Sequence, residues 1–392
     1  MAARPRDRAD GSERGTANSS GKRLPEQEKK LEDVSKDRRR SGAWTRRVLF
    51  SLVPVCALFL AGELAVRWFS FPYGEANSRF RTHRRLRYVL RANYRIRKDG
   101  AVHESSNRFG LRGSSDMRRE KGRRFRIAAI GDSVTFGLGL ADSQTYPAQL
   151  ERLLNRRAGG PRFEVLNAGL SGYSPIQSRL YFEQRVAAFR PDLVLWQFIE
   201  DDVTDVLDYR PLEGARYHLR TSALYWYLTY KWGDLRYRLF ILPNRVGVDR
   251  SALPPAGWIR RVSMHAAAFP VASANQDKLR GRPIMAEEIR RLHATARRIG
   301  TKVVMVFFPY VGDRASRTIP STDAWLAGLS RREGYHYVSL TRRFIREPAG
   351  LPLYLPQDSI HPNTRGHALA ARFLADALDR MGLIPMPKRP PD

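Results

Sequence analysis

The sequence predicts an α/β fold with a mainly parallel sheet, preceded by one transmembrane helix. Two observations predict it. Apolar, strand-like runs alternate with helix-like runs from residue 125 to residue 381. Continuously apolar strands separated by helices are typical of a parallel sheet that is buried on both faces. Far upstream lies a mostly apolar run, Val48–Val66, which at about 1.5 Å per residue just spans a hydrocarbon core.

Composition limits the class of protein. The 392 residues leave room for one large α/β domain with appendages, and the formal net charge is +30. Arginine supplies most of this charge and is spread over the whole length, whereas nucleic-acid binders usually cluster their charge on one element. We therefore expect no nucleic-acid partner. An affinity for anionic polysaccharide or lipid headgroups fits the charge better.

Cysteine and histidine usage argues against a metal centre. The single cysteine, Cys56, cannot form an intramolecular disulfide and excludes zinc sites built on cysteine. The eight histidines show no metal-ligand spacing. We predict neither a metal nor a cofactor.

The N-terminal part divides into a tail and an anchor. Residues 1–42 are polar, highly charged and poor in large apolar groups, so we expect them to be disordered. Residues 43–69 are predicted to form a signal anchor, with arginine and tryptophan on both sides of the apolar run. Glu63 argues against a membrane span, because a carboxylate in the hydrocarbon core is costly. Arg67, however, lies four residues further along and can pair with it. A buried core helix or a cleaved signal peptide is the alternative, although the basic leader is long and no clear cleavage site follows.

The sequence indicates the orientation of the anchor only weakly, because both flanks are basic and the positive-inside rule depends on a difference between them. Long domains cross the membrane regardless of their charge. We expect the N-terminus inside and the large domain outside the cytoplasm. The expected location is the inner (cytoplasmic) membrane as a single-pass protein, with the catalytic domain extracytoplasmic or periplasmic.

The large domain is expected over residues 121–383, after a turn-rich connecting arm at 70–120 and before a tail at 384–392. Apolar and β-branched runs predict its strands, and spaced apolar positions predict its helices. The expected strands are Phe125–Ile130, Phe163–Asn167, Asp192–Phe198, Lys302–Phe308 and Tyr335–Leu340. The expected helices are Tyr146–Arg157, Gln177–Ala188, Ala286–Ile299, Thr322–Arg332 and Thr364–Met381.

An insertion at residues 209–285 interrupts the alternation of strands and helices. It is rich in aromatic residues: Tyr217, Tyr225, Trp226, Tyr227, Tyr230, Trp232 and Tyr237. Residues in this insertion recur at helical spacing, which favours a lid helix whose side chains pack into the core. The alternative is that exposed aromatic faces stack on sugar rings.

Two short motifs carry chemistry. A serine, Ser133, follows the first strand in the run Gly131-Asp132-Ser133-Val134-Thr135-Phe136-Gly137, and the run Asp358-Ser359-Ile360-His361 lies near the end of the chain. Together they supply a nucleophile, a general base and an orienting acid, which is the minimum set for acyl transfer by a serine. Each residue alone has a simpler interpretation, with Ser133 or Asp358 as a helix cap and His361 as a turn residue. All three coinciding in one chain is hard to attribute to chance.

These motifs resemble those of the SGNH/GDSL hydrolase superfamily, over roughly residues 105–383. The serine block resembles Gly131–Gly137, the glycine block resembles Asn167-Ala-Gly169-Leu-Ser171-Gly172-Tyr-Ser174, and the last block resembles Asp358-Ser-Ile-His361-Pro-Asn-Thr-Arg-Gly366-His. The resemblance implies a three-layer, flavodoxin-like α/β/α domain of the membrane-anchored, bacterial envelope type. It also implies that Ser133, Asp358 and His361 form a catalytic triad. The backbone N–H groups of Ser133 and Gly172 would then point into the oxyanion hole.

One block departs from the family pattern. The family has Gly-x-Asn-Asp after its third strand, and the asparagine amide donates to the oxyanion. The aligned run here is Ile199-Glu200-Asp201-Asp202, with Asp201 at the asparagine position. An ionised carboxylate cannot donate and would repel the oxyanion. Asp201 could instead be protonated, since nearby acidic residues and burial raise the pKa of a carboxyl group. The hole could also rely on Ser133 and Gly172, with or without Gln197, or the enzyme could be slow or specialised.

The resemblance implies a serine esterase or acyltransferase that acts on ester bonds. We expect a hydrolase of acyl esters, chiefly acetyl, on a cell-envelope glycan or lipid. A polysaccharide O-acetyltransferase would use the same triad with a sugar as the acceptor, and an envelope protein could supply its acyl groups. The alternative from a different functional class is a non-catalytic polysaccharide-binding protein with a degraded oxyanion hole. Asp201 at the asparagine position motivates this hypothesis.

Overall fold

A computed structural model describes residues 50–65, 79–113, 117–159, 162–211, 271–348, 350–356 and 358–387. The chain divides into two compact units, Met1–Phe69 and Ser70–Asp392, each described here by itself. The predicted N-terminal tail and every aromatic residue singled out in the insertion lie outside the described residues.

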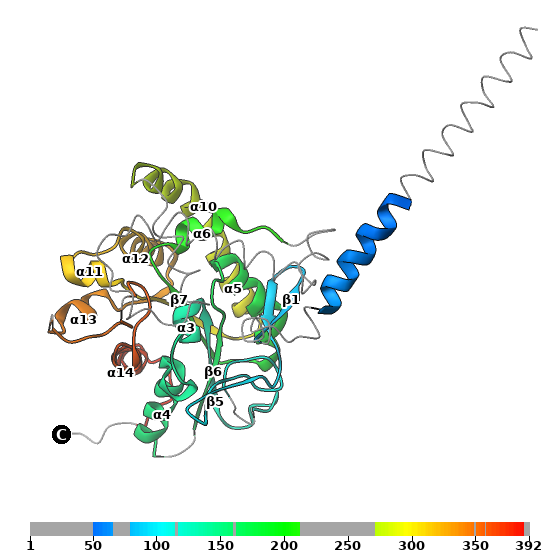
Figure 1. Ribbon diagram of the computed structural model, residues 1–392. Coiled ribbons are helices and arrows are strands. Elements are labelled where there is room, and N and C mark those ends of the chain that lie inside the picture. The colour runs from blue at the N-terminus through cyan, green and yellow to red at the C-terminus, as the bar shows by residue number, and fades with distance from the viewer. Residues whose placement is uncertain are drawn as a thin grey trace, which may run out of the picture. The chain divides into compact units, whose positions relative to one another are not determined.

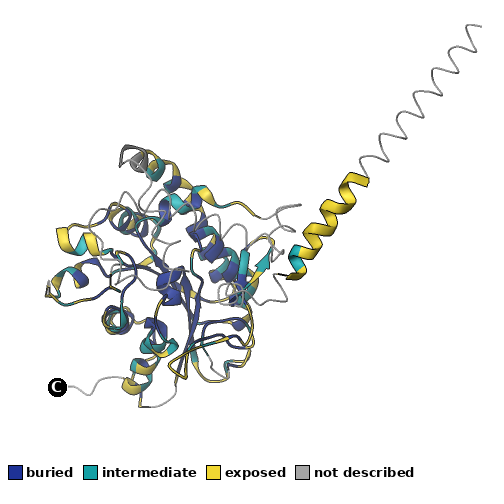
Figure 2. Ribbon diagram, viewed as in Figure 1, coloured by how far each residue is buried: buried dark blue, intermediate teal, exposed yellow. Residues whose placement is uncertain are grey.

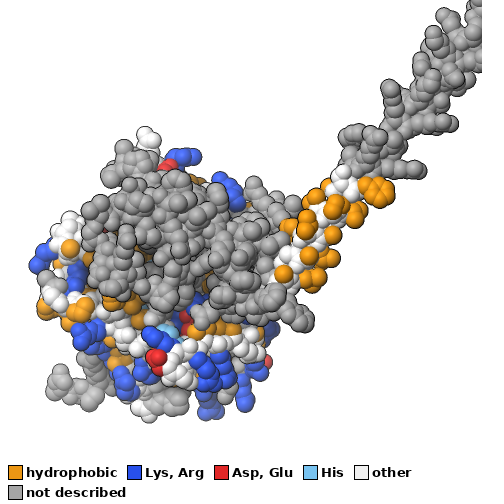
Figure 3. Space-filling model, in the orientation of Figure 1, with side chains coloured by type: hydrophobic (Ala, Val, Ile, Leu, Met, Phe, Trp, Pro, Cys, Tyr) orange, Lys and Arg blue, Asp and Glu red, His pale blue; other side chains and the backbone are white. Residues whose placement is uncertain are grey.

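The described part of the first unit is a helix over residues 50–65. Figures 2 and 3 show that this helix is exposed and carries mostly apolar side chains; Phe50 and Leu58 are 77% and 74% exposed. Among the helices of the described ranges, none is long and apolar enough to cross a membrane. Residues 43–49 and 66–69 of the predicted anchor lie outside those ranges.

The second unit is built on a five-stranded parallel sheet with the order β6-β5-β7-β8-β9. The strands are β5 (Phe125–Gly131), β6 (Phe163–Gly169), β7 (Leu193–Phe198), β8 (Lys302–Phe307) and β9 (His336–Ser339). Counted along the chain from β5, the order is 2-1-3-4-5, that of flavodoxin-like sheets. The expected parallel sheet is confirmed, and β5, β6 and β7 are buried almost throughout, as strands covered on both faces must be.

Helices cover both faces of this sheet (Figure 1). They are α3 (Ser133–Phe136), α4 (Tyr146–Arg157), α5 (Pro175–Tyr181), α6 (Asp202–Asp208), α10 (Val271–Arg298), α11 (Val311–Ser316), α12 (Ser321–Glu333), α13 (Thr341–Arg346) and α14 (Thr364–Arg380). One apolar core joins the sheet to α5, α10 and α12, and the other joins it to α4, α13 and α14. Alternate residues of β7 serve the two cores, since Trp196 belongs to the first and Leu195 to the second. These are the three layers that the sequence predicts.

Residues 79–113, part of the predicted connecting arm, have strands of their own and contribute to the core. They form two antiparallel hairpins, β1 (Phe80–His83) with β2 (Arg87–Leu90) and β3 (Arg95–Lys98) with β4 (Ala101–Ser105). Leu86, Val89 and Leu111 are fully or almost fully buried in the first core. We call residues 79–113 the hairpin arm. It belongs to the same compact unit as the sheet.

Arg112 fastens the end of the hairpin arm next to the first sheet strand. Its guanidinium is buried, forms an ion pair with Asp142 at 3.0 Å, donates to the carbonyl oxygens of Gly137 and Leu140, and lies over the Phe136 ring. Its backbone N–H donates to Asn167 at the end of β6. The arm is therefore tied to the segment after β5 and to the end of β6, next to the motif residues.

Helix α10 is longer than predicted. It begins at Val271 and not at Ala286, so the predicted insertion ends in a helix. Gly281 and Pro283 lie inside this helix, although both residue types are unfavourable in helix interiors. In the structure a Cβ at Gly281 would lie 1.6 Å from the Val203 carbonyl oxygen, so glycine permits α10 to pack closely on α6.

Basic side chains are distributed over the described surface. In the view of Figure 3, lysine and arginine appear over several separate elements. Many of them are paired; on α10, for example, Arg290 forms an ion pair with Glu333 of α12, and Arg291 forms one with Glu287 of α10 itself. This distribution agrees with the dispersed charge of the sequence.

Candidate functional site

The motif residues gather at the carboxyl edge of the sheet. Ser133 follows β5, Gly172 follows β6, Asp201 follows β7, and parallel strands place these ends on one edge. The sheet order reverses direction beside β5, which is the usual place for a ligand in such folds.

The turn that carries Ser133 depends on a glycine before it. A Cβ at Gly131 would lie 2.3 Å from Gln197 Oε1 and 2.6 Å from Thr135 Oγ1, so no other residue fits. Gln197 Oε1 accepts from the Asp132 N–H at 3.1 Å and from the Thr135 hydroxyl at 3.0 Å. Gln197 therefore supports the turn from β7, and its carbonyl is engaged there.

Asp132, and not Ser133, caps the short helix α3. The Asp132 carboxylate accepts from the Val134 N–H at 2.7 Å, while Ser133 is the first residue of the helix. The capping interpretation of Ser133 is thus wrong in geometry, and its hydroxyl is available for another partner.

That partner is His361. Its Nε2 lies 2.8 Å from Ser133 Oγ, and its Nδ1 lies 2.7 Å from Asp358 Oδ2. A carboxylate only accepts, so Nδ1 carries the proton and Nε2 accepts from the serine hydroxyl. Ser133 and His361 are 5% and 2% exposed. The three residues therefore form one hydrogen-bonded series, with Ser133 and His361 buried and Asp358 partly exposed.

The loop of Asp358 holds the carboxylate in place. Asp358 Oδ1 accepts from the backbone N–H groups of Ile360 at 2.8 Å and His361 at 2.9 Å. Burial alone would raise the pKa of Asp358, but the hydrogen bonds and charge of His361 keep that pKa below its ordinary value. Asn363, not Asp358, caps the following helix α14. Asp358 is thus an ionised acceptor that fixes the imidazole.

Two backbone donors face no protein acceptor. Within the described part of the chain, neither the Ser133 N–H nor the Gly172 N–H has a hydrogen-bond partner. Gly172 has φ +76, a left-handed conformation that glycine tolerates best, and it is exposed. Backbone N–H groups without a protein acceptor are the kind of donor that an oxyanion needs.

Asp201 occupies the start of α6 with its carboxylate turned to a tyrosine. Asp201 Oδ2 accepts from the Tyr310 hydroxyl at 2.9 Å. Burial, followed by the charge of Asp201, raises the pKa of Tyr310 far above its ordinary value, so this hydroxyl keeps its proton. Glu200, just before Asp201, is bound to Lys278 at 2.6 Å and to the N-terminus of α12. The loop after β7 is therefore held on both sides.

Three more carboxyl groups surround this loop. Burial raises the pKa of Asp132 to about 6, with His361 and several hydrogen bonds opposing the rise. Burial and the charges of Asp132 and Asp205 raise the pKa of Asp202 well above its ordinary value. Burial and the charge of Asp201 raise the pKa of Asp205 to about 8. The site thus lies in a strongly acidic cluster whose members resist ionisation.

Asp205 gives a stability test. A carboxyl with a raised pKa stabilises the fold below its unfolded pKa of about 4, and this stabilisation is lost as the pH rises through the folded value. The Asp205→Asn variant cannot ionise. Between pH 5 and pH 8 its free energy of unfolding should therefore rise relative to wild type by about 2–4 kcal/mol. Urea unfolding of the full chain at both pH values measures this.

The matched control is Asp208→Asn, because Asp208 is an exposed carboxyl on the last turn of the same helix. It should keep most of the wild-type pH dependence, because the charge of Asp208 is the smallest of the causes that raise the pKa of Asp205. An Asp205→Asn variant that also keeps it would contradict the raised pKa.

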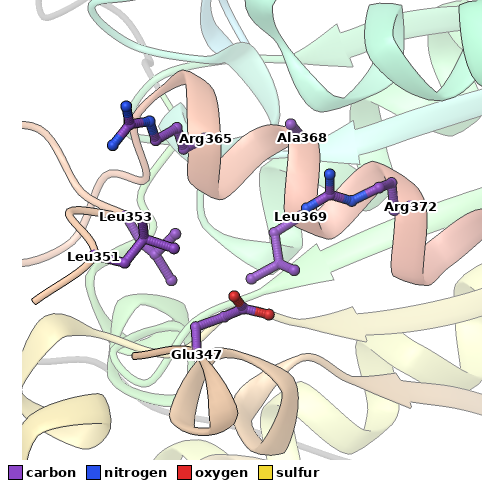
Figure 4. A pocket seen from close by; sticks show the side chains of 7 residues that line it. All are labelled: Glu347, Leu351, Leu353, Arg365, Ala368, Leu369 and Arg372. Carbon is purple, nitrogen blue, oxygen red and sulfur yellow. The ribbon is translucent and has the colours of Figure 1, made fainter. Parts of the chain in front are cut away.

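A separate pocket of about 160 Å³ lies away from these residues. Figure 4 shows Arg365, Leu369 and Arg372 of α14 on one side and Glu347 on the other. Its lining includes none of Ser133, His361, Asp358 or Gly172. Among the described residues no group of three or more His, Cys, Asp or Glu side chains could hold a metal ion.

Comparisons with known proteins found neither a matching family model nor a matching curated protein. Solved structures do match. A protein described as lipolytic, of the G-D-S-L family, from Desulfitobacterium hafniense has 15% identity and a TM-score of 0.38, over 65% of this chain and all of its own. A catalytic mutant of an acetylxylan esterase from Geobacillus stearothermophilus has 16% identity and a TM-score of 0.40, over 66% and 95%. A two-domain esterase active on acetylated mannans has 16% identity and a TM-score of 0.39, over 69% and 52%.

Two residues at the site were not expected from the sequence. Tyr310 follows β8, and its position at the carboxyl end of a strand was the one signal that could have found it. Tyr88 lies in β2 of the hairpin arm, where nothing in the local sequence points to a site.

Proposed function

We propose that this chain is a serine ester hydrolase that removes acyl groups, chiefly acetyl, from a glycan or lipid of the cell envelope. The observation that carries the proposal is the hydrogen-bonded series Asp358–His361–Ser133 beside two backbone N–H groups without protein acceptors. The acetyl group and the envelope substrate rest on the resemblance of the motifs to membrane-anchored SGNH hydrolases.

The reaction follows from the hydrogen bonds. His361 Nε2 takes the hydroxyl proton as Ser133 Oγ attacks the ester carbonyl, and Asp358 stabilises the imidazolium that forms. The N–H groups of Ser133 and Gly172 donate to the oxyanion. His361 then protonates the leaving alcohol, the ester bond breaks, and the acyl group stays on Ser133. A water molecule, deprotonated by His361, releases it as a carboxylic acid.

The experiment is labelling of the full chain in detergent micelles with a fluorophosphonate, followed by mass spectrometry of the labelled peptide. The probe reacts with serines activated by a neighbouring base. We expect one adduct, on Ser133. No adduct on the wild-type chain would favour the non-catalytic binding protein. If acetate release from an acetylated glycan is slow and an added sugar speeds the turnover of the acyl-enzyme, the enzyme is a transferase.

We further propose that Val48–Val66 anchors the chain in the inner membrane with the hydrolase unit outside the cytoplasm. The exposed apolar surface of residues 50–65 supports this, since such a surface is unfavourable in water. An alkaline phosphatase fused to the C-terminus should be active in bacteria. An inactive fusion would overturn the orientation.

A further inference from the structure

The turn after β6 contains the Ser171–Gly172 peptide, whose N–H group is one of the two proposed oxyanion donors. The Tyr173 N–H donates to the Leu170 carbonyl at 3.1 Å and closes the turn around Ser171 and Gly172. The Ser171 carbonyl and the Gly172 N–H belong to one peptide unit. Because that unit is planar and trans, these two groups point in opposite directions. Whatever fixes the carbonyl also fixes the N–H.

The carbonyl is held by Tyr88 from the hairpin arm. The Tyr88 hydroxyl donates to the Ser171 oxygen, and a Cβ at Gly172 would come within 3.0 Å of the same hydroxyl oxygen. The Tyr88 ring packs against Tyr173, with centroids 5.4 Å apart, and against Phe80 at 5.0 Å. In return, the Tyr173 hydroxyl donates to the Tyr88 carbonyl oxygen. The turn and strand β2 therefore hold each other through two hydrogen bonds and a ring contact.

We propose that Tyr88 is a positioning residue for the oxyanion hole: its hydroxyl fixes the Ser171–Gly172 peptide so that the Gly172 N–H points at the developing oxyanion. This rests on the proposed function, since it assigns a role within the same site. A donor in an oxyanion hole works only when it is already oriented. The hydrogen bond at the carbonyl also polarises the peptide, which makes the N–H at its other end a stronger donor.

The contacts around Tyr88 make the hairpin arm a rigid support. The Gln177 amide donates to the Leu86 carbonyl at 3.0 Å, and Leu86 and Val89 on either side of Tyr88 are almost fully buried. A residue far from Ser133 in sequence is thereby fixed against the glycine turn. The arm contributes to the site through Tyr88 and not only through its position in the chain.

The test compares Tyr88→Phe with Tyr181→Phe in the full chain. Tyr181 is the matched control because its hydroxyl donates to the Gly110 carbonyl of the same arm at 3.2 Å, while its ring contacts Tyr173. It makes no hydrogen bond to the Ser171–Gly172 peptide. Steady-state hydrolysis of p-nitrophenyl acetate gives kcat and KM. Titration with the fluorophosphonate counts the folded, active sites, so a variant that folds poorly is corrected for.

We expect Tyr88→Phe to lower kcat per active site about tenfold, a part of the 10²–10³-fold that loss of a whole donor costs. KM should change less than about twofold, because the donor acts in the transition state. The inhibition constant of an alkyl trifluoromethyl ketone, whose serine adduct carries an oxyanion, should rise by the same factor as kcat/KM falls. Tyr181→Phe should change none of these by more than about twofold.

Equal kcat values for Tyr88→Phe and Tyr181→Phe would overturn the proposal, as would an effect confined to KM. An unchanged inhibition constant for the ketone would also overturn it, since that result points to a merely structural role. In each of these cases an active wild type leaves the esterase function standing. A wild type without titratable sites would overturn both.

Discussion

Replacing Ser133 by alanine is expected to lower kcat for p-nitrophenyl acetate hydrolysis by on the order of 10⁴-fold or more. The hydroxyl that receives the acyl group is gone, and His361 has no nucleophile to deprotonate at 2.8 Å. His361→Ala should cost a similar factor, because the base and the nucleophile act as one unit. The double variant should be no slower than either single variant. Steady-state rates of the full chain in detergent measure all three.

The control for this series is Ser143→Ala, which changes an exposed serine of the short 3-10 helix Asp142–Gln144 that precedes α4. It should keep the wild-type rate and the wild-type fluorophosphonate labelling. If Ser133→Ala and Ser143→Ala hydrolyse the ester equally well, the activity comes from another residue or a contaminant, and the proposed mechanism fails.

The sheet could be predicted because its strands are fully buried. Such strands read as continuous apolar runs, and β5 and β7 start or end within one residue of the predicted bounds. Helix α4 has the predicted bounds, Tyr146–Arg157. The hairpin arm could not be predicted in the same way. β3 is a charged and mostly exposed strand, Arg-Ile-Arg-Lys, without the apolar run that marks the buried strands. Its pairing with β4 runs through the two-residue turn Asp99-Gly100, in which both residues have a positive φ.

The three residues of the hydrogen-bonded series could be found from the sequence, because Ser133, His361 and Asp358 occur in short motifs at element boundaries. Their companions could not. Tyr88 and Tyr310 are ordinary tyrosines whose roles depend on a partner far away along the chain, such as Ser171 or Asp201. A hydrogen bond across that separation leaves no pattern in a single sequence.

Asp201 stands where the family pattern has an asparagine that donates to the oxyanion, so its charge bears directly on the proposed reaction. The carboxyl group stands after β7, among Asp132, Asp202 and Asp205, and receives the Tyr310 hydroxyl at 2.9 Å. An ionised carboxylate here would repel the oxyanion. The hydrogen bond that it accepts from Tyr310 does not turn this repulsion into an attraction. The two backbone donors would then have to stabilise the oxyanion against a nearby negative charge.

The Asp201→Asn variant is therefore expected to raise kcat by about 10–100-fold, because it removes a repulsive charge and adds an N–H donor. The amide oxygen of asparagine can still accept from Tyr310, so the geometry of the loop is kept. Asp201→Ala is the matched control, since it removes the charge without adding a donor. It should raise kcat less than Asp201→Asn does, and the ratio of the two rates measures the donor alone.

A rate below wild type in both variants would reverse the interpretation. It would mean that the acid itself contributes, with the protonated carboxyl donating to the oxyanion while its other oxygen accepts from Tyr310. The wild-type rate would then fall as the pH rises and Asp201 ionises, whereas Asp201→Asn would lack this loss. The pH profiles of the two proteins therefore distinguish a weakened oxyanion hole from one that uses a carboxylic acid.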